Sequence, residues 1–421
     1  MSATPIRAPR GTLDLLGPEA AAHERVRARA AALFASAGYE RIETPAFEAT
    51  ELFVRGVGEA TDIVEKEMYT FQDGSGRSLT LRPEGTAPIC RAYIEHGMHK
   101  RPAPVKLWYW GPFFRYERAQ SGRYRQFFQV GAEAFGSDDP ALDAELIALL
   151  VTLAQELGAR GLTLRIASLG TGESRAAYRE ELREFLRANQ EQLAPEVRAR
   201  IDANPLRAFD AKDAGTAAVM ARAPLLLDRL SREDAEHFAS VRELLEGAGI
   251  GYEVDPRLVR GLDYYTRTVF ELSSSELGAQ SGVGGGGRYD RLVEQLGGPP
   301  TPAIGFAAGI ERLLLAGTPA AIGADQAAPA LYIAFGSGQP QGDERARAFA
   351  LWREALAAGI GAQIELRGRT LKRALAHADR LGYRYVAILQ GEELALRDMR
   401  AGAQRACDAS ELLAAIGERA R

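Results

Sequence analysis

Residues Leu258 to Glu271 carry a high density of charged and aromatic side chains between apolar ones. In a β-strand, Arg260 and Tyr264 would share one face and Tyr265 would lie on the other. Thirteen residues further on, the segment Gly284 to Asp290 begins with four consecutive glycines. Glycines let a ligand approach the backbone closely. The two segments together therefore predict a small-molecule pocket.

The segment Phe113 to Arg118 places Arg115 at the end of a predicted strand, before a loop rich in arginine and glutamine. The guanidinium group is planar and permanently charged, so it can form paired hydrogen bonds to phosphate. This pattern predicts a polyphosphate site. A solvated hairpin with alternating charge is the other interpretation of the same residues.

Residues Arg82 to Thr86 follow one predicted strand and precede a predicted helix. Glu84 could bind a substrate ammonium group and Thr86 could cap the helix. The alternative is a simple capped turn from strand to helix, with no substrate.

Two further patterns could belong to the same pocket. Gln129 and Glu133 share one face of an aromatic-rich strand with a glycine between them, which indicates a pocket floor or an exposed sheet face. Arg312 follows a run of small residues from Ala303 to Gly309 and falls in the first turn of a predicted helix. A lone arginine at such a position is usually a surface residue.

Several other kinds of site are disfavoured. There is no GxxxxGK[ST] phosphate loop, no convincing GxGxxG fingerprint and no HExxH pattern, and no Ser-His-Asp or Cys-His pairing is evident. The only cysteines, Cys90 and Cys407, exclude a disulfide framework and a cysteine-rich zinc site. No metal ligands are assigned.

The 421 residues are enough for two or three domains, and the composition, 46% hydrophobic and 26% charged, is that of a globular protein. The order of helix and strand patterns along the chain predicts a mixed region over 1–320. A helical insertion at about 173–245 interrupts this region. A linker rich in Ala, Gly and Pro at 317–329 precedes alternating strands and helices over 330–421. That alternation predicts an α/β domain with a largely parallel sheet.

The net charge of −4 gives no bulk basic field for nucleic acid. Residues 341–421 carry 14 Lys and Arg against 11 Asp and Glu, so the relatively basic surface is C-terminal. Neither an apolar run of 18 residues nor a signal peptide is found, and we expect a cytoplasmic protein without membrane association.

These motifs match one enzyme family. Gly38 to Pro45 is similar to class II motif 1, Phe114 to Arg118 to motif 2, and Gly305 to Arg312 to motif 3. Leu258 to Glu271 and Gly284 to Asp290 resemble the two signatures specific to histidine enzymes. Over essentially its whole length, the chain resembles histidyl-tRNA synthetase, a class II aminoacyl-tRNA synthetase.

The resemblance implies roles for particular residues. Arg115 would hold the α-phosphate of ATP and Arg312 the γ-phosphate. The expected histidine-binding residues are Glu84, Gly85, Thr86, Gln129, Glu133, Arg260, Tyr264 and Tyr265. Of these, Glu84, Thr86 and Gln129 would bind the α-amino group, and Glu133 and Tyr265 would read the imidazole. Arg260 and Arg115 would be catalytic, because both would stabilise charge as the carboxylate attacks.

The resemblance also implies an α+β fold: an antiparallel class II sheet with flanking helices, the helical insertion, and a C-terminal α/β domain of the anticodon-binding type. ATP would be a substrate with Mg²⁺, the partners would be L-histidine and a histidine-specific tRNA, and the chain would form a homodimer. A regulatory paralogue of ATP phosphoribosyltransferase is the alternative, although such proteins usually lack the C-terminal domain.

Three features depart from the family pattern. Phe128 stands where histidine is common, and we expect it to pack away from Gln129, in the interior or beside the site. Arg291 stands where glycine is usual, which could alter a turn or a tRNA contact. The C-terminal signature around Leu371 to Asp379 is weak, which leaves the anticodon contacts open.

Overall fold

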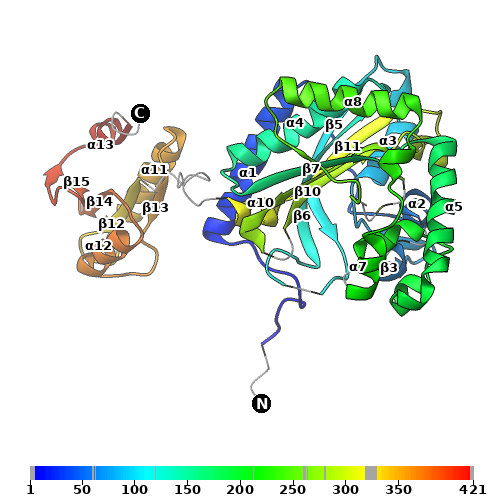
Figure 1. Ribbon diagram of the computed structural model, residues 1–421. Helices are drawn as coiled ribbons and strands as arrows, with labels where there is room; N and C mark the ends of the chain where they lie inside the picture. The colour runs from blue at the N-terminus through cyan, green and yellow to red at the C-terminus, as the bar shows by residue number, and fades with distance from the viewer. Residues whose placement is uncertain are drawn as a thin grey trace. The chain divides into compact units, whose positions relative to one another are not determined.

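A computed structural model describes residues 5–58, 61, 63–118, 120–211, 213–258, 262, 264–278, 281–317 and 330–417. The chain forms two compact units, Met1–Gly323 and Ala324–Arg421 (Figure 1). Among the described residues, no helix is both long and apolar enough to cross a membrane.

The first unit is built on an eight-stranded sheet with the order β1-β5-β6-β11-β10-β9-β7-β8. Its strands are β1 (Glu40–Arg41), β5 (Val105–Phe114), β6 (Gln126–Phe135), β7 (Leu162–Ser168), β8 (Glu253–Val254), β9 (Thr266–Ser274), β10 (Gly282–Arg288) and β11 (Ala303–Gly309). The six inner strands pair antiparallel, and the two short edge strands pair parallel. The expected α+β fold with an antiparallel sheet is confirmed.

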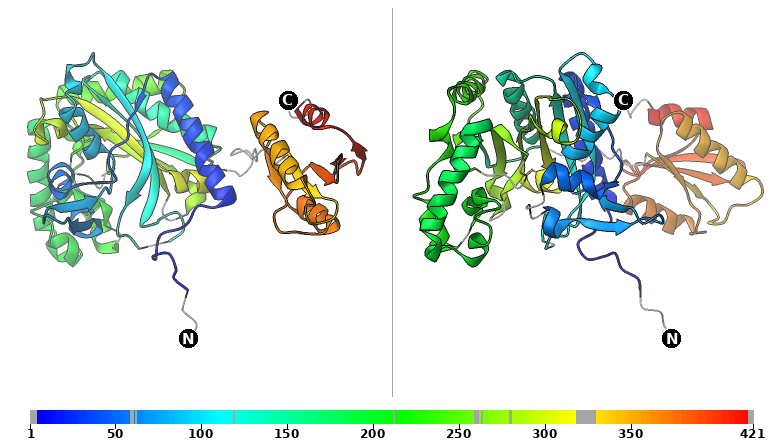
Figure 2. Two further views of the ribbon diagram at one scale, coloured as in Figure 1. Left: turned by 180° about the vertical axis from the view of Figure 1, so that it is seen from behind. Right: turned by 90° about the vertical axis from the view of Figure 1, so that its right-hand side faces the viewer.

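The two faces of this sheet have separate cores, because successive side chains of a strand point to opposite sides. One core contains Val130, Ala132 and Ala134 of β6 and the apolar sides of α1 (Gly17–Ser36), α4 (Pro140–Glu156), α8 (Arg232–Gly247) and α10 (Ile310–Ala316). Figure 2 shows the sheet at the centre of the unit, with helices on either side.

The other core begins with Phe135, on the opposite face of β6. Against it pack α3 (Thr86–Glu95), α5 (Gly172–Ala188) and α7 (Ala214–Met220). The predicted insertion is helical as expected, but α8 packs against α4 on the first face, whereas α5 packs on the second. The insertion therefore supplies helices to both faces of the sheet.

A smaller sheet has the order β2-β4-β3, with β2 at Phe47–Ala49, β3 at Tyr69–Gln72 and β4 at Ser78–Leu81. Strands β3 and β4 form a hairpin, and the residues that join them, Asp73 to Gly76, are of the types that favour tight turns. Helix α2 (Thr50–Val57) packs beside it.

The strand expected from Leu258 is shorter than predicted. Tyr264 lies in a turn, Tyr265 has no regular secondary structure, and β9 begins only at Thr266. At Arg267 the backbone has φ +40°, and the register against β10 shifts between Gly287 and Arg288. An irregularity of this kind re-aims neighbouring side chains, so strict alternation does not apply to the two tyrosines.

The second unit has a five-stranded sheet, β13-β12-β14-β15-β16. Its elements are β12 (Leu331–Phe335), α11 (Glu344–Ala357), β13 (Ala362–Ile364), α12 (Leu371–Arg380), β14 (Tyr385–Gln390), β15 (Glu393–Asp398), β16 (Gln404–Ala406) and α13 (Ala409–Gly417). The first three strands of the order pair parallel, but β15 and β16 add antiparallel. The expectation of a largely parallel sheet is therefore wrong for β15 and β16. These two short strands contain charged residues and were not predicted as strands.

Candidate active site

A cavity of about 260 Å³ opens on the α3 side of the main sheet. Its polar lining comprises Glu84, Thr86, Tyr109, Arg115, Glu117, Arg123, Tyr124, Gln129, Tyr264, Tyr265, Glu271, Tyr289, Glu311 and Arg312. Of the predicted site residues that the structure describes, all but Glu133 line it. Segments that are far apart in sequence thus meet around one space.

Arg115 follows the last residue of β5, where the strand pairing with β6 ends. Its Nε donates to the carbonyl of Pro83 at 2.8 Å, and the guanidinium lies over the ring of Phe127, 5.4 Å from the centroid. These two contacts fix the plane of the guanidinium group and therefore the directions of its Nη atoms. Such a group can form bidentate hydrogen bonds to a phosphate.

Arg312 reaches the same cavity from the first turn of α10. Its Nε donates to the carbonyl of Gly282 on β10, and burial lowers the pKa of the guanidinium, as does the nearby Arg123. Two cations so close together favour an anionic ligand. Glu117 partly balances them, since its carboxylate pairs with Arg123 at 2.9 Å.

Glu84 lies at the start of α3, and its carboxylate accepts from the backbone N–H groups of Thr86 at 2.7 Å and Ala87 at 2.9 Å. It therefore caps the helix, a role that the sequence suggested for Thr86. Burial raises the pKa of Glu84. The carboxylate still lines the cavity, so capping and binding a cationic group are compatible.

The amide of Gln129 carries a buried Oε1 with no hydrogen-bond partner, and the hydroxyl of Tyr109 is likewise buried and unpaired. Both residues line the cavity. Buried polar atoms are seldom left unsatisfied in a folded protein. The arrangement is therefore suited to a ligand that donates hydrogen bonds, such as an ammonium group.

Glu133 is fully buried beneath the cavity floor. It accepts from the hydroxyl of Thr86 at 2.9 Å and from the hydroxyl of Tyr289. Burial raises its pKa well above the ordinary value, and the neighbouring Glu84 adds to the effect. Glu133 thus contacts the cavity lining through its hydrogen bonds to Thr86 and Tyr289.

Tyr264 and Tyr265 stack edge to face with centroids 4.8 Å apart, and both are almost completely buried. Both line the cavity even though they are consecutive residues, because they precede the strand. Arg260 lies outside the described residues, so its expected position near the substrate carboxylate stays a prediction.

At Gly284 and Gly286 of β10, the packing of the protein itself requires glycine. A Cβ at Gly286 would lie 1.9 Å from the carbonyl oxygen of Gly305, and one at Gly284 would lie 2.8 Å from that of Ala307. The run was expected to make room for a ligand. Gly284 and Gly285 do line the cavity, but the close approach of β11 excludes larger side chains as well.

At Gly85 the constraint comes from a pocket residue. A Cβ there would lie 2.7 Å from the ring of Tyr109. The tight contact holds the turn before α3 against the aromatic side chain, beside the buried Glu84 and Thr86.

Sequence reasoning missed Tyr109, Glu271 and Glu311. Burial raises the pKa of Glu311 to about 7, and its carboxylate accepts from the backbone N–H of Phe128 at 3.0 Å and 3.2 Å. The only sequence signal was that Glu311 directly precedes Arg312 after the run of small residues.

Two departures from the family pattern are accommodated. Phe128 packs on the opposite face from Gln129, against His23 at 5.3 Å and Trp110 at 6.2 Å between ring centroids, as predicted. Arg291 has φ −106°, a value that any residue can adopt, so the turn there does not need glycine.

Comparison with known proteins agrees with this geometry. Residues 11–313 match the profile of the family described as histidyl-tRNA synthetase. The chain is 47% identical over 413 residues to the histidine–tRNA ligase of Rubrobacter xylanophilus, covering 95% of this chain and 96% of that one. It is 46% identical to that of Desulforamulus reducens, covering 98% and 99%.

Two solved structures are also similar. The apo histidyl-tRNA synthetase of S. aureus has a TM-score of 0.80 and 34% identity, covering 98% of this chain and 100% of that one. A Bacillus halodurans protein titled ATP phosphoribosyltransferase regulatory subunit/histidyl-tRNA synthetase has a TM-score of 0.65 and 24% identity, covering 93% and 100%, which shows the fold alone. The full-length identity and the matched profile support the ligase over the regulatory alternative: the chain belongs to the histidyl-tRNA synthetase family.

Proposed function

We propose that this chain activates L-histidine with ATP and then transfers the histidyl group to a histidine-specific tRNA. The observation that supports this most strongly is a single cavity lined by both cations and hydrogen-bond acceptors. Arg115 and Arg312 would form its phosphate end, and Glu84 and Gln129 would supply acceptors for an ammonium group at its amino-acid end.

In the first step, a carboxylate oxygen of histidine attacks the α-phosphorus of ATP, and the bond to the leaving pyrophosphate breaks. The transition state spreads negative charge over the phosphate oxygens, and catalysis is mostly positioning and charge stabilisation. Arg115 would hold the α-phosphate and Arg312 the terminal phosphate. Arg260 would stabilise the reacting carboxylate and phosphate, so Arg260→Ala should lower the adenylation rate more than histidine affinity.

Histidine would enter with its amino group against Glu84, Thr86 and Gln129. Its imidazole would meet Tyr265 and the pair formed by Glu133 and Tyr289. Glu133 would either exchange a hydroxyl partner for the imidazole or act through that partner. A site whose buried polar groups need partners rejects amino acids that lack the imidazole nitrogens.

Magnesium would accompany the ATP. Among the described residues, no group of three or more His, Cys, Asp or Glu side chains could hold a metal ion alone. Mg²⁺ in nucleotide sites usually takes one or two carboxylates together with phosphate oxygens. Glu117 and Glu271 line the cavity with Arg312 and fit that role, in which the ion would neutralise phosphate charge.

The second unit has a groove suited to RNA. Arg367, Arg369, Arg373, His377 and Arg380 line a cavity of about 510 Å³ beside α12. Concentrated positive charge on an otherwise acidic chain is the electrostatic footprint of nucleic-acid binding. This unit would contact the anticodon region of the tRNA, and the insertion would contact its acceptor arm.

We further propose a homodimer. The small sheet exposes Phe47 and Phe71, whose ring centroids lie 6.3 Å apart, and Tyr116 is 54% exposed nearby in the fold, against Tyr69. Exposed aromatic clusters commonly mark protein interfaces. Sedimentation of the purified chain would show a dimer.

Because tRNA charging serves translation, we expect the enzyme in the cytoplasm.

The proposal is tested by charging. Purified protein, ATP, Mg²⁺ and labelled L-histidine should yield acid-precipitable histidyl-tRNA with tRNA that contains the histidine acceptor. Parallel reactions with other labelled amino acids are the control. A sample that charges no tRNA, but co-purifies with and activates a short ATP phosphoribosyltransferase, would instead establish the regulatory alternative.

A further inference from the structure

Helix α8, from the insertion, turns two titratable side chains toward the main sheet. Asp234 and His237 are three residues apart, so they share one side of the helix. Both are buried, at 1% and 7% relative exposure. The proposed chemistry uses neither residue, yet each begins a chain of contacts that ends beside a tyrosine of the cavity.

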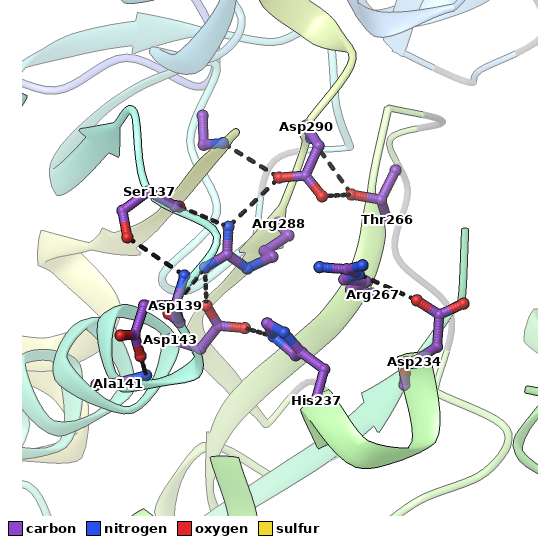
Figure 3. A network of polar contacts seen from close by, with 12 residues as sticks. Ser137, Asp139, Ala141, Asp143, Asp234, His237, Thr266, Arg267, Arg288 and Asp290 are labelled. Atoms are coloured by element: carbon purple, nitrogen blue, oxygen red, sulfur yellow. Dashed lines mark hydrogen bonds and ion pairs between the residues drawn. The ribbon is translucent and has the colours of Figure 1, made fainter. Parts of the chain in front are cut away.

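The first chain of contacts runs through a buried ion pair (Figure 3). The Nε2 of His237 lies 2.8 Å from one carboxylate oxygen of Asp143 on α4. The other oxygen of Asp143 lies 2.6 Å from an Nη of Arg288, the last residue of β10. Asp143 and Arg288 are both completely buried.

Arg288 is held from several sides. Its guanidinium also donates to the carbonyls of Ser137 at 3.0 Å and Asp139 at 3.1 Å, and an Nη lies 3.4 Å from the carboxylate of Asp290. Arg288 thus links its own strand, β10, to α4 and to the loop that precedes α4. The backbone of Arg288 cannot move without breaking these contacts.

The next residue, Tyr289, belongs to the cavity. Its hydroxyl donates to Glu133, and its backbone N–H donates to the carbonyl of Ala303 at 2.8 Å. Asp290 then accepts from the hydroxyl of Thr266 at 3.0 Å. Arg288 and Asp290 therefore anchor the backbone on both sides of the tyrosine.

The second chain of contacts starts at Asp234. Its carboxylate lies 3.0 Å from the Nε of Arg267, the residue with positive φ near the start of β9 (Figure 3). Two positions before Arg267 is Tyr265, and its carbonyl accepts a hydrogen bond from Arg175 of helix α5. The backbone that carries Tyr265 is therefore held by two helices of the insertion.

We propose that Asp234 and His237 are positioning residues for histidine binding, acting through Arg267 on Tyr265 and through Asp143 and Arg288 on Tyr289. This inference rests on the proposed function, since it takes the tyrosines to line a histidine pocket. A buried ion pair often stabilises a fold no better than well-packed apolar residues. What it supplies here is a fixed geometry, because hydrogen-bonded charges tolerate less displacement than apolar contacts.

The test compares substrate affinities in variants of His237. His237→Leu removes the contact to Asp143, whereas His237→Gln keeps an amide N–H that can reach it. Glu236→Ala, on the exposed side of the same helix, is the matched control. Calorimetric titration gives the Kd of histidine and of ATP, and steady-state exchange gives KM and kcat.

We expect His237→Leu to raise the Kd and KM for histidine about tenfold, with the Kd for ATP changed less than about twofold. His237→Gln should restore histidine affinity to within about threefold of the wild type, and Glu236→Ala should change nothing. Asp234→Asn should give the same selective loss through the second chain of contacts. If His237→Leu does not fold, His237→Asn, whose amide is too short to reach Asp143, takes its place.

Equal losses of histidine and ATP affinity, or unchanged histidine affinity in a folded His237→Leu variant, would overturn the inference. Failure of the glutamine variant to restore affinity would do so as well. These results leave the proposed function standing as long as the wild type activates histidine. A wild type that does not bind histidine at all would overturn both.

Discussion

The two ends of the cavity are built in different ways. At the amino-acid end, Glu133, Tyr289 and Thr86 are buried and already bonded to one another. At the phosphate end, Arg115 and Glu117 are partly exposed, and Arg123 lies in the exposed loop after β5. The difference indicates that the proposed histidine pocket is a preformed buried network, whereas the proposed phosphate site is partly open to solvent.

The largest effect is expected at the phosphate end. Arg312→Ala should lower kcat of ATP-dependent activation by about a thousandfold, because a positive charge that would stabilise the leaving phosphates is lost. The KM for histidine should change little. Initial-rate kinetics in both substrates would show this, with Arg232→Ala on exposed helix surface as the control. A comparable loss in histidine KM would mean that the two ends are not separate.

The complementary change is at the amino-acid end. Glu133→Gln should raise the KM for histidine by about 10- to 100-fold, because it disturbs hydrogen bonds inside a buried network. ATP affinity should stay near the wild-type value. An unchanged histidine KM would refute the assignment of Glu133 to recognition.

A steric substitution tests the same end without removing a functional group. The Cβ of Gly305→Ala would lie 1.6 Å from Oε2 of Glu133, so the carboxylate must shift. We expect a destabilisation of about 1–3 kcal/mol in thermal or denaturant unfolding, with weakened histidine binding. Gly297→Ala is a less suitable control because of its positive φ, so Gly247→Ala, which has open space around it, is preferred. Unchanged stability and unchanged histidine binding would show that the hydrogen-bond network around Glu133 can accommodate the added methyl group.

The smallest effect is a pH dependence at the phosphate end. Burial raises the pKa of Glu311 to about 7, above the value near 4.5 of an unfolded chain. The folded state therefore binds more protons between these values, and the stability contributed by this group is present below pH 4.5 and lost as pH rises through about 7. The charge that forms should also weaken ATP binding.

Glu311→Gln should flatten both dependences. The stability difference between the variant and the wild type should change by about 3 kcal/mol or less from pH 5 to pH 8. Unfolding curves and ATP titrations across this range provide the measurement. Parallel pH profiles for the two proteins would show that Glu311 does not titrate there.

Much of the fold follows from local patterns in the sequence. Apolar periodicity identifies α1 and α4, each of which buries one continuous side, and the turn residues Asp73 to Gly76 mark the hairpin of β3 and β4. The strand expected from Leu258 was too long, since the β-forming residues Tyr264 and Tyr265 precede β9 without belonging to a strand. Local propensity cannot show that these two tyrosines line a pocket formed by segments distant in the sequence.

The candidate site, like the fold, was only partly predictable from local sequence patterns. Motif residues such as Arg115, Gln129 and Arg312 were found from sequence and line one cavity, although their roles stay predictions. Tyr109 and the contact of His237 with Asp143 were not found, because they depend on packing between segments about a hundred residues apart. No local pattern marks a buried aspartate as the partner of a distant histidine.

The most direct test of the account is histidine-dependent exchange of labelled pyrophosphate into ATP, measured without tRNA. The account predicts exchange with L-histidine, and none above background with the other amino acids, because only histidine satisfies both the ammonium and the imidazole contacts. Absence of histidine-dependent exchange in the folded protein, or equal exchange with a second amino acid, would contradict it.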